Sequence, residues 1–350
     1  MAILKPDSTV LSNSILHSNS VDLDISLIGG STNNVVRVLS SDNSGNLLFT
    51  DVSPLTIYEF YQIKFQGETA GYVSGGSYNQ STIDKFPFAT SYSVSDVGEL
   101  SVARYWLSGQ SSSSDGYSFG GSTGPSTGNT TIDKFPFSSD TSATSIALTY
   151  GTGTIGTAAQ SSSTHGYATG FGYIQKFSFS SDSNALYVSS FSRRYGAGQT
   201  SSTHGYTSGG TTTSGFADGS TIDKFPFSSD TSATDVGEVL VARFYHSAQS
   251  SETHGYNAAG YNFNAGSYTS HLEKLSFASD SNGVGVSGLI GGAREGASGQ
   301  SEVSYGYVSG GFSNSGSFTT IEKFPFSSDT NSSDVAELTQ ARSATAGHQI

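Results

Sequence analysis

Cysteine is absent from the 350-residue chain. A disulfide framework, a thiolate metal site and a cysteine nucleophile are therefore excluded, and the absence fits assembly in a reducing cytoplasm. Charge is also scarce, because only 12% of the residues are Asp, Glu, Lys or Arg and the formal net charge is −13. An acidic chain offers no basic footprint for nucleic acid and is repelled by an anionic membrane, so we expect neither partner.

Long apolar runs are lacking too. The amino end, MAILKPDSTVLSNSILHSNS, has no continuous apolar segment of the kind that a signal peptide needs. No stretch approaches the roughly 18 apolar residues of a membrane-spanning helix, so we expect no membrane insertion. Glycine (43), tyrosine (19) and phenylalanine (22) are abundant instead, beside many serines and threonines. This composition is typical of short strands joined by tight turns rather than of a disordered chain.

One phrase, TIDKFPF or a close variant, recurs six times with steps of 49, 42, 48, 50 and 49 residues. A second series is Gly-Tyr, often followed by a double glycine, and a third is an arginine six residues before a glutamine. Each repeat therefore holds four short segments, ARxxxxGQ, GYxxGG, TIDKFPF and DVGELxVAR, which have the composition and the flanking turn residues of strands. The lysines of the recurring phrase are Lys85, Lys134, Lys176, Lys224, Lys274 and Lys323.

Four strands in a unit of roughly 50 residues are typical of one blade of a β-propeller. The last repeat ends with a first segment, from about Arg342 to Ile350, that has nothing after it. The three segments that it lacks lie far upstream, from about Gly71 to Val102. Joining the two ends completes a sixth blade and removes the sheet edges that a linear stack would expose. We therefore predict an all-β fold, a six-bladed propeller over residues 67–350 that is closed by pairing the C-terminal strand with the N-terminal blade.

The alternation of side chains along a strand assigns the recurring phrase to two faces. Ile83 and Lys85 share one face, and Asp84 shares the other with Phe86 and Phe88. We expect the aromatic pair to wedge between adjacent blades. The proline between them cannot donate to a ladder, so we expect it at a strand end or a bulge.

The order GYSFGG, IDKFPF, GELSVAR and then a new strand resembles the kelch repeat. The usual kelch tryptophan is missing from the repeats, since the chain has only Trp106, so the repeat is kelch-like rather than a close member. The longest recurring sequence is IDKFPFSSDTSATDVGEL. Over about residues 69–350, the repeat sequences are similar to those of repeat proteins encoded by tailed bacteriophages, especially those of marine and cyanobacterial hosts. This resemblance implies a virion component, assembled in the host cytoplasm, of the tail fibre, neck or capsid appendage type.

Residues 1–66 contain no repeat phrase, and VDLDISLIGG, NVVRVLSS and NLLFTDV read as strands of a small β-rich module. Phage appendage proteins commonly dock through such a module. The resemblance therefore implies that residues 1–66 bind other virion proteins, with a homo-oligomer or several copies in the particle. The alternative is an extra strand or arm packed on the propeller.

Two sets of side chains are candidates for binding. If the first segment of each blade is innermost, the recurring arginines lie near one mouth of the channel, where guanidinium groups can grip a carboxylate or an acidic glycan. The structural alternative is that each arginine bonds to blade carbonyls or to a nearby acid such as Glu99 or Glu238. The arginines are Arg104, Arg193, Arg243, Arg294 and Arg342, and the candidate aromatic contacts for a host polysaccharide are Tyr117, Tyr206 and Tyr256.

Metal and enzyme sites are weakly indicated. The histidines of the THGY phrases lie on different blades, too far apart for one metal ion, and the SSD aspartates are typical of turns, so we expect no metal and no cofactor. Glycoside hydrolysis needs a carboxylate pair, and carboxylates that depart from the repeat, such as Glu252, Glu295 and Glu302, are expected at the surface. We therefore expect a non-enzymatic structural and binding protein. Two alternatives stay open, a glycan-binding host-receptor protein and a glycan-degrading enzyme.

Overall fold

The computed structural model describes residues 36–41, 47–52, 66–78, 80–89, 93–124, 127–151, 153–212 and 219–350. The chain divides into two compact units, Met1–Gln62 and Ile63–Ile350. Every helical or extended element in the described ranges is a β-strand, which confirms the all-β prediction. Within these ranges, no helix has the length and apolar character needed to cross a membrane.

The described part of the first unit is one antiparallel pair of strands. Strand β1 (Val36–Ser41) pairs with β2 (Leu47–Val52). The strands predicted from NVVRVLSS and NLLFTDV are therefore confirmed, whereas VDLDISLIGG lies outside the described residues. The docking role of residues 1–66 stays a prediction.

The second unit is a six-bladed β-propeller, and each blade is a four-stranded antiparallel sheet. The innermost strands are β6 (Ser108–Ser111), β12 (Ala158–Ser161), β17 (Ala197–Thr200), β22 (Ser247–Ser250), β28 (Ser298–Ser301) and β34 (Ala346–Gln349). The second strands are β3 (Ala70–Gly76), β7 (Asp115–Phe119), β13 (His165–Gly170), β18 (His204–Ser208), β23 (His254–Ala258) and β29 (Tyr305–Ser309). The third strands are β4 (Gln80–Pro87), β10 (Thr131–Pro136), β14 (Gly172–Ser178), β20 (Thr221–Pro226), β26 (His271–Ser276) and β32 (Thr320–Pro325). The outermost strands are β5 (Ser95–Glu99), β11 (Thr144–Leu148), β15 (Leu186–Phe191), β21 (Thr234–Glu238), β27 (Val284–Gly288) and β33 (Ser333–Glu337).

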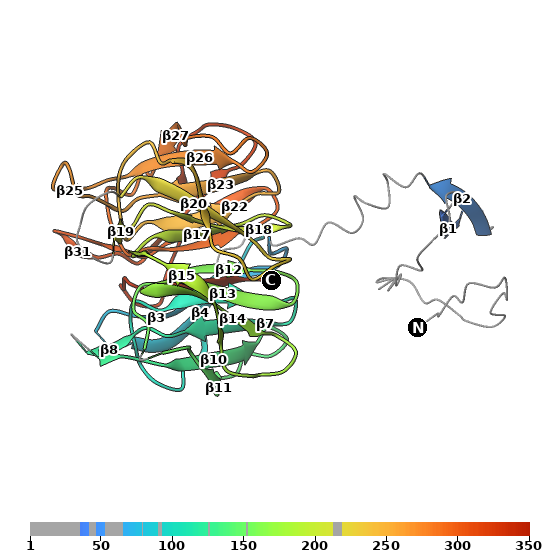
Figure 1. Ribbon diagram of the computed structural model, residues 1–350, viewed down its shortest axis with the longest axis horizontal. Helices are drawn as coiled ribbons and strands as arrows, with labels where there is room; N and C mark the ends of the chain where they lie inside the picture. The colour runs from blue at the N-terminus through green and yellow to red at the C-terminus, as the bar shows by residue number, and fades with distance from the viewer. Residues whose placement is uncertain are drawn as a thin grey trace. The chain divides into compact units, whose positions relative to one another are not determined.

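Short two-stranded ribbons extend from the blades, and Figure 1 shows β8, β25 and β31 projecting on the same side of the propeller. The ribbons are β8 (Ser122–Gly124) with β9 (Thr127–Gly128), β16 (Arg193–Arg194) with β19 (Thr211–Thr212), β24 (Tyr261–Asn262) with β25 (Ser267–Tyr268), and β30 (Phe312–Ser313) with β31 (Gly316–Ser317).

The propeller is closed by the last strand of the chain, as predicted. Strand β34 pairs antiparallel with β3, which places Gln349 opposite Gly71 and Ala346 opposite Ser74. Each innermost strand also contacts the innermost strands of both neighbouring blades, so the six strands form a continuous ring around the channel. The sixth blade is thus built from both ends of the propeller sequence.

Small residues in the middle of the innermost strands allow this ring to be narrow. A Cβ atom built on Gly198 would lie 2.2 Å from the carbonyl oxygen of Ala159, and one on Gly299 would lie 2.0 Å from that of Ala248. Glycine is required where one backbone approaches another this closely. The inner strands therefore pack backbone to backbone around the channel.

Aromatic side chains of the recurring phrase wedge between blades, which confirms the predicted faces. Phe86 and Phe88 pack on Tyr307 of the preceding blade, with ring centroids 5.5 and 4.9 Å apart. On the other face of the strand, Ile83 joins the core cluster shared with the following blade. The Gly-Tyr series reflects the same packing, because a Cβ on Gly71 would lie 2.4 Å from the ring of Phe86.

Lysines of the recurring phrase link successive blades at the surface. Five of them pair with the aspartate that ends the SSD or ASD motif of the next blade, at N···O distances of 2.5 to 3.2 Å. The aspartates are about half exposed, so each pair contributes only about 0–1 kcal/mol. The pairs are Lys85 with Asp140, Lys134 with Asp182, Lys176 with Asp230, Lys224 with Asp280, and Lys274 with Asp329.

Removing β34 should open the propeller. A chain that ends at Thr345 leaves β3 with an unpaired edge and breaks the ring of inner strands. We expect a lower urea midpoint and new binding of a hydrophobic dye, and we expect a synthetic peptide of residues 341–350 to restore both. A peptide with the same composition in scrambled order is the control. Unchanged stability of the shortened chain would contradict this account of closure.

Candidate functional site

The five recurring arginines are buried ion-pair partners. Arg104, Arg243, Arg294 and Arg342 are 0% exposed and Arg193 is 8% exposed. Each pairs with the acid that precedes the lysine of the recurring phrase, and not with Glu99 or Glu238. The pairs are Arg104 with Asp133 (2.9 Å), Arg193 with Asp223 (3.0 Å), Arg243 with Glu273 (2.7 Å), Arg342 with Asp84 (2.7 Å), and Arg294 with Glu322.

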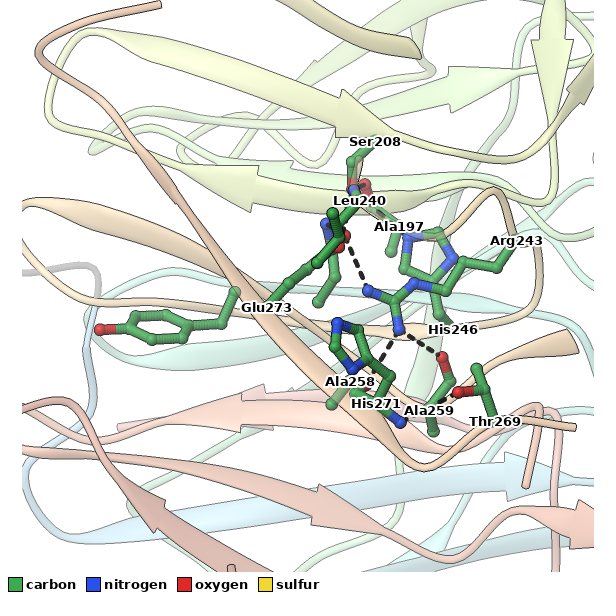
Figure 2. A network of polar contacts seen from close by, with 12 residues as sticks. Ala197, Ser208, Leu240, Arg243, His246, Ala258, Ala259, Thr269, His271 and Glu273 are labelled. Atoms are coloured by element: carbon green, nitrogen blue, oxygen red, sulfur yellow. Dashed lines mark hydrogen bonds and ion pairs between the residues drawn. The ribbon is translucent and has the colours of Figure 1, made fainter. Parts of the chain in front are cut away.

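Figure 2 shows one of these pairs at close range, around Arg243. Its Nη1 atom donates to the backbone carbonyls of Ala259 (3.0 Å) and His271 (2.9 Å), while Nη2 pairs with Oε1 of Glu273. The other carboxylate oxygen of Glu273 accepts a hydrogen bond from the backbone N–H of Leu240 at 2.8 Å. Arg243 and Leu240 belong to the connection from β21 to β22. The pair therefore attaches the connection between β21 and β22 to the blade that begins with β22.

The blade built from β12 to β15 lacks both members of the pair. Thr154 occupies the arginine position and Gln175 the acid position, and both side chains are buried. Gln175 keeps part of the acid's role, because its Oε1 atom accepts from the backbone N–H of Tyr150 at 2.8 Å. Losing one charge alone would leave the other buried without a partner, which is costly, so the two charges are absent together.

The candidate tyrosines are also interior. Tyr117, Tyr206 and Tyr256 are at most 3% exposed, and burial raises the pKa of each phenol. Tyr117 stacks on Phe179 of the next blade with centroids 4.8 Å apart, and the other two make the equivalent contact. In this structure neither the arginines nor these tyrosines present a side chain to a ligand in the channel. The arginines precede the inner strands and turn back into the blade.

The glutamines that follow the arginines form hydrogen bonds from one blade to the next. Gln110 donates from Nε2 to the carbonyl of Tyr167 at 2.9 Å, and Gln249 donates to that of Tyr307 at 2.9 Å. His348 takes this position in the sixth blade, where its Nε2 atom lies 2.9 Å from the hydroxyl of Ser74. Burial lowers the pKa of His348 to about 4, so the imidazole is neutral at physiological pH.

At one end of the channel, the second residue after each arginine position forms a closed ring of backbone hydrogen bonds. Each backbone N–H donates to the carbonyl of the equivalent residue in the preceding blade, at N···O distances of 2.6 to 3.0 Å. All six residues have φ between 53° and 65°. Four are not glycine, and such residues cost about 1–3 kcal/mol each in this region. The ring consists of Trp106, Gly156, Tyr195, Tyr245, Gly296 and Ala344.

Three aromatic side chains of this ring cover the channel end, and we call Trp106, Tyr195 and Tyr245 the aromatic mouth. Trp106 stacks on Tyr245 with centroids 4.1 Å apart, and Tyr195 contacts Tyr245 at 4.7 Å. Burial is the largest cause that raises the pKa of Tyr245, followed by the neighbouring Tyr195. Bulky residues with positive φ are uncommon, and backbone strain of this kind clusters at functional sites. The aromatic mouth is therefore our candidate functional site.

Two cavities meet at the aromatic mouth. The channel, of about 580 Å³, is lined by the inner strands and by the aromatic mouth, and residues such as Gln66 and Glu68 line it as well. A side pocket of about 400 Å³ lies next to Trp106 and is also lined by Glu295. Glu295 was expected at the surface, but it is partly buried, and burial raises its pKa to about 7 from an ordinary 4.5. In the described residues, no group of three His, Asp or Glu side chains is placed to hold a metal ion.

Sequence reasoning missed the aromatic mouth because it followed the features that the repeats share. The two residues after the arginine position differ in every repeat: they are Tyr-Trp, Ile-Gly, Arg-Tyr, Phe-Tyr, Glu-Gly and Ser-Ala. That variability within an otherwise regular unit is the signal that was available. It marks positions where the packing of the blades does not require the same residue in every repeat.

No family model matches the chain, and no curated protein matches it. Among solved structures, one titled "Structure of YjhT" matches with a TM-score of 0.61 and 11% sequence identity, covering 78% of this chain and 99% of that chain. At this identity the likeness shows the fold alone. It supports the six-bladed propeller, whereas the kelch-like repeat and the phage origin stay predictions.

The buried pairs can be tested by giving one blade the residues of another. Arg104→Thr or Asp133→Gln alone should cost about 3–5 kcal/mol of unfolding free energy, because each leaves a buried charge unpaired. The double variant copies the natural Thr154 and Gln175 arrangement and should cost clearly less than the sum of the two. Urea unfolding of the four chains measures the coupling, and simple additivity would contradict it.

Glu295→Gln should stabilise the protein at high pH. Because the folded-state pKa of Glu295 lies above 4.5, the folded chain holds a proton that the unfolded chain has released between about pH 4.5 and 7. Stability is therefore lost as the pH rises through this window, and glutamine cannot ionise. We expect a higher Tm than the parent at pH 8 and nearly the same Tm at pH 5. Glu252→Gln, at an exposed position, is the control, and an equal gain at both pH values would refute the assignment.

Proposed function

We propose that this protein is a non-enzymatic structural and binding component of a tailed-phage virion. In this proposal residues 1–66 dock onto other virion proteins, and the propeller presents the aromatic mouth for recognition of a protein or of a host-surface glycan. The repeat phrases over residues 69–350 support the virion setting through their similarity to phage-encoded repeat proteins. A propeller fold fits a binding role.

The observation that carries the binding role is the contrast between the repeated side chains and the aromatic mouth. Arginine, glutamine, tyrosine and phenylalanine of the repeats are engaged in contacts within and between blades. Trp106, Tyr195 and Tyr245 are held at positive φ at a channel end instead. Rigid aromatic rings offer contact area at low entropic cost, which suits a recognition surface.

The non-enzymatic part of the proposal is supported by the acids of the site. Glycoside hydrolysis uses two carboxyl groups, about 5–10 Å apart. Among the described residues that line the side pocket, Glu295 is the one acid, and its pKa shift is caused by burial rather than by a second carboxylate. A lone carboxyl group lacks the partner that this reaction requires.

A host-receptor role is the second candidate, and the stacked rings of Trp106 and Tyr245 favour it, since aromatic faces pack well on the apolar faces of sugars. In this version the ligand is an envelope polysaccharide of the host. Saturable binding of the full chain to host cells, competed by purified polysaccharide, would distinguish it from a purely structural role.

The virion setting can be tested with antibodies raised against the full chain. We expect gold-labelled antibody to decorate intact purified particles at a fixed position on the tail, neck or capsid. Particles from a deletion of the gene are the control. Unlabelled wild-type particles, together with absence of the chain from their protein content by mass spectrometry, would refute the proposal. Release of sugar fragments from host polysaccharide by the purified chain would refute its non-enzymatic part.

A further inference from the structure

The side pocket at the aromatic mouth combines aromatic walls with one carboxylate. Its aromatic lining residues are Tyr78, Tyr105, Trp106 and Phe312, and Glu295 supplies the acid. The other described lining residues are glycine, alanine and serine, so the pocket has no basic side chain among them. The volume of about 400 Å³ lies in the range of small-molecule sites.

Glu295 is held in place by the backbone. Its N–H donates to the carbonyl of Phe312 at 2.9 Å, and the N–H of Phe312 donates back at 2.8 Å. The next residue, Gly296, belongs to the closed ring of hydrogen bonds, so the backbone of Glu295 is fixed beside the aromatic mouth. Contacts within the protein therefore position the backbone that carries this acid.

Other interior acids of this propeller each have a basic partner, which Glu295 lacks. Asp84, Asp133, Glu273 and Glu322 are fully buried, and each pairs with an arginine. Glu295 is partly withdrawn from water as well, yet no ion pair or side-chain hydrogen bond joins it to another described residue. A cation that enters the pocket would supply the missing partner.

We propose that the side pocket binds an organic ammonium group, with Glu295 as its counter-ion and the rings of Tyr78, Trp106 and Phe312 as its walls. Aromatic faces attract ammonium cations, by about 0.5–1 kcal/mol at exposed sites and about 2 or more when the cation is desolvated. The net charge of −13 favours the approach of a cation over that of an anion. An acidic glycan is the ligand class that this pocket disfavours.

The inference deepens the proposed binding role and rests on it for its biological setting only. Ammonium groups at a bacterial surface are carried by amino sugars and by lipid headgroups, and both offer the same chemistry to the pocket. Choline and ethanolamine represent the headgroups, and glucosamine represents the sugars. Glucose is the matched neutral probe for glucosamine, because the two differ in the amino group.

Trp106 allows binding to be read directly, because it is the single tryptophan of the chain and lines the pocket. The full chain is titrated with each probe at pH 8, and Trp106 emission is recorded. We expect a saturable change with at least one ammonium probe and none with glucose. Glu295→Gln should weaken that binding at least tenfold, and Tyr78→Ala, at a side chain that is 81% exposed, should weaken it severalfold without affecting folding.

Glu252→Gln is the matched control and should bind like the parent. The titrations with different probes distinguish the two sources of the ammonium group. A response to glucosamine alone indicates an amino sugar, and a response to choline or ethanolamine alone indicates a lipid headgroup. The proposal is overturned if no ammonium probe gives a saturable change up to about 50 mM, if glucose acts as glucosamine does, or if Glu295→Gln leaves the affinity unchanged. Because these titrations need no phage particle, their failure is distinct from failure of the virion proposal.

Discussion

The pairing of β34 with β3 is the interaction on which the rest of the propeller depends. It joins the two ends of a 288-residue unit, from Ile63 to Ile350, and converts five complete blades and two fragments into a closed ring. Without it, the aromatic faces at the joint would lose a neighbour, and two sheet edges would be exposed. The inner-strand ring and the hydrogen-bonded ring at the aromatic mouth each pass through this joint, since Gly347 and Ala344 belong to them.

The repeated residues and the candidate site serve different purposes. Side chains of the recurring phrase have structural roles, since Asp84 holds the crossing chain, Lys85 reaches the next blade, and Phe86 packs on the preceding one. A repeat of this kind is uniform because every blade solves the same packing problem. The positions that differ between blades are then free to serve recognition, and the aromatic mouth is made of such positions.

This division explains how much the sequence could predict. Period, blade number, closure and the two faces of the recurring phrase can be derived from local alternation and from counting segments, and the structure bears these out. Arg104 was placed at a channel mouth, because a pattern gives the spacing of a residue but not the direction in which a connection turns. The positive φ of Trp106 and the burial of Glu295 depend on contacts between residues distant in sequence, which local patterns do not contain.

The cyclic hydrogen bonding at the channel end has a further consequence for ligand chemistry. Successive residues that include a left-handed conformation often form a concave nest whose free amides capture phosphate or carboxylate. Here all six amides are committed to one another, head to tail, and the cycle has no terminal donor. The backbone of this ring therefore has no N–H to offer an oxyanion at this opening. Selectivity there falls to the side chains, which include the rings of the aromatic mouth, the Arg194 guanidinium 5.3 Å from the Tyr195 ring centroid, and Glu295 in the side pocket.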